Sequence, residues 1–185
     1  MHLVVGLGNP GREHENQRHN VGFVVLDAIR RAEGWPEYKQ KFSGGWTRGR
    51  LGAQEVALLE PHTFMNLSGE SVQAAAAFLK VPPEGIILVH DDLDLPWQSV
   101  RLKAGGGHAG HNGIRSVIQR LGSPDFVRVR VGIGRPPPGF RGEVSDWVLS
   151  NFDPRESAEV PLVVEAATSA IRRAVDGILS PMRSQ

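Results

Sequence analysis

Short apolar runs alternate along the chain with segments of helical periodicity, and this alternation restricts the fold more than any other feature. HLVVGLG (residues 2–8) and the start of GIILVHDDLDLP (residues 85–96) are nearly continuous in apolar side chains, as strands buried on both faces are. FVRVRVGIG (residues 126–134) alternates instead, as a strand with one basic face does. Strands of the first kind need helices on both sides of their sheet.

Four segments between these runs have the residue spacing of helices. They cover residues 19–34, 68–80, 111–123 and Pro154–Leu179. We expect Ser68 to be the N-cap of the second helix. We expect Pro161 either to lie near the true start of the last helix or to kink it.

Two further runs, residues 42–51 and 54–60, predict a β-hairpin, and residues 99–104 predict another strand. RPPPGFRG, residues 135–142, cannot form regular structure and predicts an exposed loop. The chain shows no linker and no internal repeat. Residues 1–185 are therefore expected to form a single α/β domain, with a mixed β-sheet flanked by helices on both faces.

The composition excludes several classes of protein. None of the 185 residues is a cysteine, so disulfides, thiolate metal sites and a cysteine nucleophile are excluded. No apolar run approaches the roughly 20 residues of a membrane span, and the first residues lack the basic-then-apolar pattern of a signal peptide. We therefore expect a cytoplasmic enzyme or binding protein of one domain.

Polar side chains gather where the predicted strands end, which is where ligands bind in open α/β sheets. Asn9 follows the first strand, and His19 opens the next helix. A later strand runs into Asp91, and Asn66 lies just ahead of the alanine-rich helix. These groups can converge on one cleft.

His19 and Asp91 suggest an acid–base pair. A histidine that acts as a base needs a partner on one ring nitrogen to fix its tautomer, and a carboxylate at a neighbouring strand end could be that partner. The alternative is that His19 only caps a helix and Asp91 only an unrelated turn. No serine stands in a nucleophile-elbow pattern, so the nucleophile in an enzyme of this kind would be water.

GGGHAGHNG, residues 105–113, combines a bare backbone with close polar groups. Glycines allow a substrate backbone to approach closely, and the helix that follows would present Asn112 to it. A metal half-site at His108 and His111 is a second interpretation, but no other ligand pattern such as HExxH supports it. Phe64, in TFMN, could equally be a core residue.

Basic residues are concentrated in one third of the chain, although the net charge is only +1. Charge alone does not decide between a solvated basic face and a phosphate-binding patch beside a site. The residues concerned are Arg101, Lys103, Arg115, Arg120, Arg128, Arg130 and Arg135.

Six ordered motifs carry a resemblance that covers essentially the whole chain. They are VGLGNPG, RHNVGF, TFMNLSGESV, HDDLDLP, GGGHAGHNGIRS and RVGIGRP, and NFDPRE follows before the last helix. In this order and spacing they resemble bacterial peptidyl-tRNA hydrolases. The resemblance implies a single α/β domain with a twisted mixed sheet. It also implies hydrolysis of the ester between a peptide and the terminal ribose of tRNA, which returns free tRNA to translation.

The resemblance also implies roles for individual residues. His19 would be the general base that activates water, Asp91 would orient it, and Asn9 would help to distinguish blocked from free aminoacyl-tRNA. The peptide backbone and the tRNA end would be held by Asn66 and Asn112, with Phe64 lining the same pocket. Lys103 and Arg130 would clamp the 5′ phosphate region of the tRNA, with Arg101, Arg128 and Arg135 as helpers.

The sequence departs from the family pattern in one loop. His14 stands where the family usually has a tyrosine that contributes to substrate binding, and Gln17 stands where threonine is common. We expect no metal, no cofactor and no membrane contact, with peptidyl-tRNA as the partner of a monomer. Two other functions are an RNA-binding splicing partner without hydrolase activity, as in some organellar relatives, and a metal-dependent hydrolase. The presence of His19, Asp91 and the asparagines favours the enzyme over the RNA-binding protein. Insensitivity to chelators would argue against the metal-dependent hydrolase.

Overall fold

The computed structural model describes residues 1–178 of the chain and contains one seven-stranded sheet, with the strand order β2-β3-β4-β1-β5-β7-β6. The predicted strands all lie in it, and a three-residue edge strand, β2, was not predicted. The strands are β1 (His2–Gly6), β2 (Lys39–Lys41), β3 (Gly44–Leu51), β4 (Gln54–Pro61), β5 (Ile86–Asp92), β6 (Val100–Ala104) and β7 (Val127–Gly132).

The sheet is mixed, as predicted. The four central strands β4, β1, β5 and β7 are parallel, whereas β2, β3 and β6 join antiparallel to their neighbours. Strands β1 and β5 are almost wholly buried, which explains their continuous apolar sequences. Because they run in one direction, the residues that follow them meet at one edge of the sheet.

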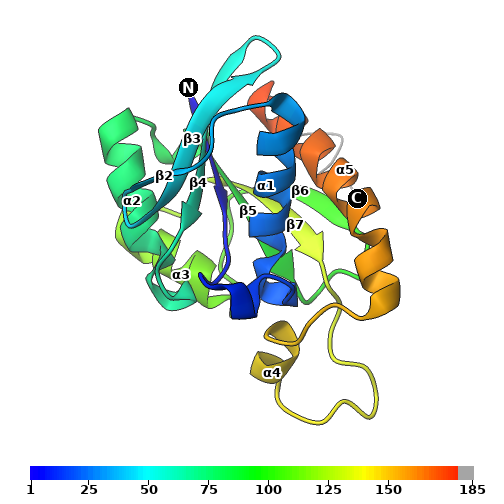
Figure 1. Ribbon diagram of the computed structural model, residues 1–185. Coiled ribbons are helices and arrows are strands. Elements are labelled where there is room, and N and C mark those ends of the chain that lie inside the picture. The colour runs from blue at the N-terminus through cyan, green and yellow to red at the C-terminus, as the bar shows by residue number, and fades with distance from the viewer. Residues whose placement is uncertain (179–185) are drawn as a thin grey trace.

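Helices cover both faces of the sheet (Figure 1). Helices α1 (Val21–Glu33) and α5 (Pro154–Val175) pack on one face, and α2 (Ser68–Leu79) and α3 (Asn112–Leu121) pack on the other. Each face has its own buried apolar cluster, and each large aliphatic side chain within a cluster contributes about 1.5–3 kcal/mol by leaving water. No helix within residues 1–178 is long and apolar enough to cross a membrane.

Two details of the helices differ from the prediction. Ser68 is the first residue of α2 rather than its N-cap; its hydroxyl donates to the carbonyl of Met65 in the preceding turn. Pro161 lies inside α5, which begins at Pro154 as expected. This helix ends at Val175, shortly before Gly177, whose φ of 77° lies outside the helical range; the predicted end at Leu179 lies outside the described residues.

A short helix, α4 (Val144–Val148), was not predicted. It follows the irregular segment 135–142, which was expected to be a loop, and together they project below the layered body (Figure 1). Glu143 and Asp146 form a capping box at its start, which supports a helix of only five residues.

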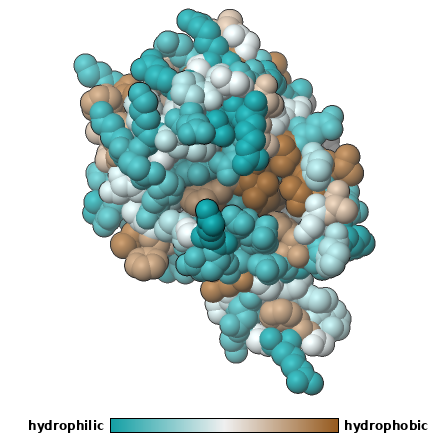
Figure 2. Space-filling model, in the orientation of Figure 1, coloured by the Kyte–Doolittle hydropathy of each residue, from teal (hydrophilic) through white to brown (hydrophobic). Residues whose placement is uncertain are grey.

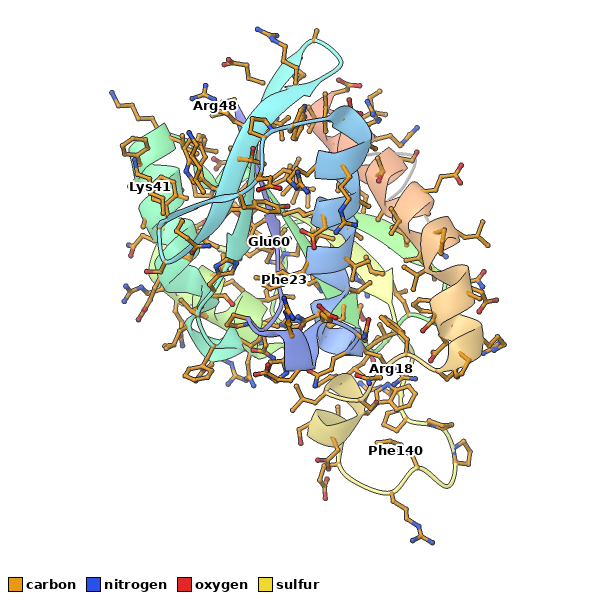
Figure 3. The ribbon with its side chains drawn as sticks, viewed as in Figure 1. Arg18, Phe23, Lys41, Arg48, Glu60 and Phe140 are labelled. Carbon is orange, nitrogen blue, oxygen red and sulfur yellow. The ribbon has the colours of Figure 1, made fainter. Side chains whose placement is uncertain are left out.

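One buried arginine ties this projecting segment to the body. Arg18, which is 4% exposed, donates to Oε1 of Glu156 at 2.5 Å and to the hydroxyl of Ser150 at 2.6 Å. It also donates to the carbonyl of Asn151, and its guanidinium lies 3.6 Å from the centroid of the Trp147 ring. Figure 3 shows Arg18 at the junction of α4 with the body. Arg18, which directly precedes His19 in the chain, therefore connects the α4 segment to the start of α5.

We predict that Arg18→Met lowers the free energy of unfolding by about 3–5 kcal/mol, because it leaves the buried carboxylate of Glu156 without its cation. Arg172→Met is the matched control, since the Arg172–Glu33 pair is exposed and worth about 0–1 kcal/mol. Urea denaturation of the two variants measures both effects. Equal losses in the two variants would contradict the prediction.

Candidate active site

A cavity of about 450 Å³ opens beyond the ends of the parallel strands. Most of the residues predicted from the sequence line it, although they come from segments far apart in the chain. These residues are Asn9, His19, Asn66, Asp91, Lys103, Asn112 and Arg130. Val144, Ser145, Val148 and Leu149 of the α4 region form another wall.

His19 and Asp91 are in direct contact. His19 lies in the short turn Arg18–Asn20 before α1, and its Nδ1 is 2.7 Å from Oδ2 of Asp91 at the end of β5. A hydrogen bond to a carboxylate places the proton on Nδ1. The second nitrogen, Nε2, is then an unprotonated acceptor on a side chain that lines the cavity, and it makes no hydrogen bond within residues 1–178.

A second histidine holds the other oxygen of the same carboxylate. His111 is the N-cap of α3, and its Nδ1 accepts from the backbone N–H groups of Gly113 and Ile114. This cap fixes the tautomer, because an accepting Nδ1 leaves the proton on Nε2. That Nε2–H donates to Oδ1 of Asp91 at 2.9 Å. The role of His111 was not predicted, although its position at the start of a predicted helix was the available signal.

The contacts around Asp91 shift the pKa values of the groups concerned. Burial alone would raise the pKa of Asp91, but His19 and His111 together hold it well below its ordinary value. Burial lowers the pKa of His19, yet the charge and hydrogen bond of Asp91 outweigh it and raise that pKa above its ordinary value of 6.5. The ring of His90 packs against that of His111. Burial, followed by repulsion from His111, lowers the pKa of His90 to about 4, so His90 is neutral.

Asn9 is oriented by three contacts. Its Oδ1 accepts from the backbone N–H of Met65 at 3.1 Å, while its own backbone N–H and carbonyl pair with the side chain of Asn20. With Oδ1 occupied, the Nδ2 amide of Asn9 is a free donor with respect to residues 1–178. An amide donor of fixed orientation therefore lies in the wall of the same cavity as His19.

Arg128 holds the glycine segment in place. Its buried guanidinium donates to the carbonyls of Gly106, Gly107 and Pro124, and burial, followed by repulsion from Arg130, lowers its pKa to about 10. Gly106 has a φ of 110°, which requires glycine. The resemblance implies that Arg128 helps to bind phosphate; in the structure both terminal nitrogens of its guanidinium donate to backbone carbonyls, although the side chain also lines the cavity.

The remaining predicted cations differ in how they are paired. Lys103 is exposed beside the cavity, and Nε of Arg130 donates to Oδ2 of Asp92 at 2.8 Å. The guanidinium of Arg135 pairs with Oδ1 of Asp94 on the exposed rim. Arg101 lies opposite Arg130 in the β6–β7 register.

Two predicted residues do not line the cavity. The ring of His14 contacts Oε1 of Gln17 at 2.8 Å, so the two positions that depart from the family pattern contact each other. Phe64 is 74% exposed and lies outside the set of residues that surround the cavity. His108, half of the alternative metal pair, accepts from the backbone N–H of Gly110 and lies in a loop rather than on a helix face.

Within residues 1–178, one group of side chains has the spacing of a metal site. It consists of His19, Asp91 and His111, whose ligand atoms all lie within 4.8 Å of one another. These atoms already pair with each other through the two hydrogen bonds to Asp91. His111 would also have to lose its Nε2 proton to bind a cation, because its Nδ1 is committed to the helix cap.

The model of the peptidyl-tRNA hydrolase family matches residues 3–184. Peptidyl-tRNA hydrolase from Sorangium cellulosum is 53% identical over 171 residues, which are 92% of this chain and 77% of that protein. The protein of the same name from Geotalea daltonii is 50% identical, over 91% of this chain and 87% of the relative.

Solved structures agree with these matches. A crystal structure of a peptidyl-tRNA hydrolase point mutant from Acinetobacter baumannii has a TM-score of 0.88 and 38% identity, and the match covers 96% of this chain and 89% of that one. Another structure from the same organism has a TM-score of 0.79 and 36% identity, covering 95% and 94%. By sequence and by fold, the chain belongs to the peptidyl-tRNA hydrolase family of enzymes.

Proposed function

We propose that the chain hydrolyses peptidyl-tRNA with His19 as the general base, with water as the nucleophile and without a metal ion. The observation that carries this proposal is the hydrogen bond between His19 and Asp91, which leaves Nε2 of His19 as an acceptor in the cavity wall. Family membership supports the substrate, a peptide joined by an ester to tRNA.

The steps follow from the donors and acceptors around the cavity. Nε2 of His19 removes a proton from water as the water oxygen adds to the ester carbonyl, and Asp91 stabilises the imidazolium that forms. The Nδ2 amide of Asn9 donates to the carbonyl oxygen as it becomes an oxyanion. The carbon–oxygen bond to ribose then breaks, and His19 returns the proton to the leaving ribose oxygen.

The rest of the cavity suits a substrate recognised through its backbone. The exposed amides of Asn66 and Asn112 can donate to peptide carbonyls and accept from peptide N–H groups, whatever the side chains. Lys103 and Arg130 supply positive charge at the same edge for tRNA phosphates. We also propose that His14 and Phe64 contact the substrate, although both lie outside the cavity.

The first prediction concerns His19→Ala, assayed with N-acetyl-aminoacyl-tRNA in excess chelator. We expect the unmodified protein to turn over and the variant to lose about a hundredfold or more in kcat, because a general base is removed. His2→Ala, the same substitution at the far end of β1, is the control. Loss of activity in chelator alone would contradict the metal-free mechanism.

The second prediction concerns pH. Because the pKa of His19 is raised and the base acts in its neutral form, kcat/KM should fall as the pH drops through a value above 6.5. Asp91→Asn removes the groups that raise this pKa and leaves burial, which lowers it. The acid limb should therefore move to lower pH while the maximum rate falls. A limb that stays in place would show that another group controls it.

The third prediction concerns salt. Lys103→Ala should weaken tRNA binding and reduce the slope of log affinity against log salt concentration by about 1, because one phosphate contact is lost. Lys39→Ala, on the exposed edge strand β2, is the matched control and should leave the slope unchanged. Filter binding between low and moderate salt measures both. An unchanged slope for Lys103→Ala would remove this residue from the phosphate contacts.

A further inference from the structure

A second cavity, of about 360 Å³, lies between β4 and the start of α1. Asn9 lines both this cavity and the one that contains His19, so the two meet at a single residue. Figure 2 shows a recess near the middle of this face, with an apolar floor and a hydrophilic rim. Figure 3 shows Phe23 of α1 beside Glu60 of β4, and both residues line the cavity.

The cavity combines apolar walls with acidic groups. Pro10, Phe23 and Val24 supply apolar surface. Asp27 and Glu60 supply carboxyl groups, and Glu15 adds a third at the exposed rim. We call this site the acid pocket.

Glu60 is the unusual member of the acid pocket. It is 6% exposed, and its Oε2 has no hydrogen-bond partner of normal geometry within residues 1–178, although it interacts with Asp27 and Tyr38. Two facing carboxyl groups offer acceptors and no donor unless one of them holds a proton. A proton on Glu60 supplies only one donor for the acceptors of the two carboxyl groups, so the site is suited to a ligand with several N–H donors.

Titratable groups face Glu60 from three elements of the fold. Asp27 and Arg30 face it from α1, Tyr38 from the segment before β2, and His62 from the end of β4. Burial, reinforced by Asp27, raises the pKa of Glu60 to about 10, so it holds a proton at neutral pH. Burial also lowers the pKa of His62, which is therefore neutral.

We propose that the acid pocket binds the ammonium or guanidinium group of a lysine or arginine side chain in the peptide part of the substrate. This inference rests on the proposed function, because Asn9 connects the pocket to the place where the ester would lie. A peptide that leaves the ester extends by about 3.3–3.6 Å per residue, which brings one of its last few side chains past Asn9. The aliphatic stem of that side chain would lie along Phe23 and Val24, with its charge at the carboxyl groups.

Binding of the cation is coupled to release of a proton. The proton that Glu60 holds at neutral pH passes to solvent when an ammonium group takes its place, and the ammonium then donates to both carboxylates. Preference for a basic side chain should therefore increase as the pH rises from 6 to 9. A purely structural role of Glu60 would produce no such dependence on the side chain of the substrate.

The test uses N-acetylated tetrapeptides attached to one tRNA, alanine throughout except for lysine, glutamine or methionine at one position in turn. At one position we expect kcat/KM for lysine to exceed that for glutamine and methionine by about fivefold or more. Glu60→Gln and Asp27→Asn should reduce that ratio to near one. Glu55→Gln, the same substitution on the exposed part of β4, should keep the ratio of the unmodified protein.

The outcomes separate the two proposals. Hydrolysis of every substrate without a lysine preference at any position would overturn the acid pocket and leave the proposed function standing. A lysine preference that survives in both variants, or that does not grow with pH, would also overturn it. Hydrolysis of none of the substrates would overturn the proposed function and the acid pocket together.

Discussion

The Asp91 carboxylate, held between two histidines at the end of β5, is the interaction on which the site depends. A buried carboxylate is costly unless both oxygens are paired, and here Oδ2 faces His19 while Oδ1 faces His111. The two histidines precede α1 and α3, which lie on opposite faces of the sheet. One side chain therefore fixes the position of both helix starts relative to the central strand.

The sequence was sufficient to predict what depends on local pattern. Continuous apolar runs identified β1 and β5, and the rule that ligands bind beyond strand ends predicted that Asn9, His19 and Asp91 can converge on one cleft. Proline and glycine correctly marked residues 135–142 as a loop. The short elements β2 and α4 were missed, and one helix start was wrong: the hydroxyl of Ser68 bonds to the preceding turn instead of capping the helix.

Contacts between distant parts of the chain could not be predicted in the same way. Arg18 and Glu156 are separated by 138 positions, and nothing in either local sequence indicates that they meet. Arg128 looked like a member of a basic face, but its donors hold the glycine segment. The pairing of Asp27 with Glu60 depends on how α1 packs against β4, a contact between elements about 30 positions apart.

The fixed tautomer of His111 has a consequence for the charge of the cleft. Because its Nδ1 accepts from the backbone, His111 cannot take up the proton that His19 removes from water in the proposed mechanism, so this proton stays on His19 until the ribose leaves. Before that transfer the negative charge lies on Asp91; afterwards the His19–Asp91 pair is neutral and the charge lies on the substrate oxygen near Asn9. The net charge of the cleft would thus stay the same while its negative end shifts from Asp91 towards Asn9. A step that conserves the net charge costs less electrostatically than one that adds a charge to the cleft.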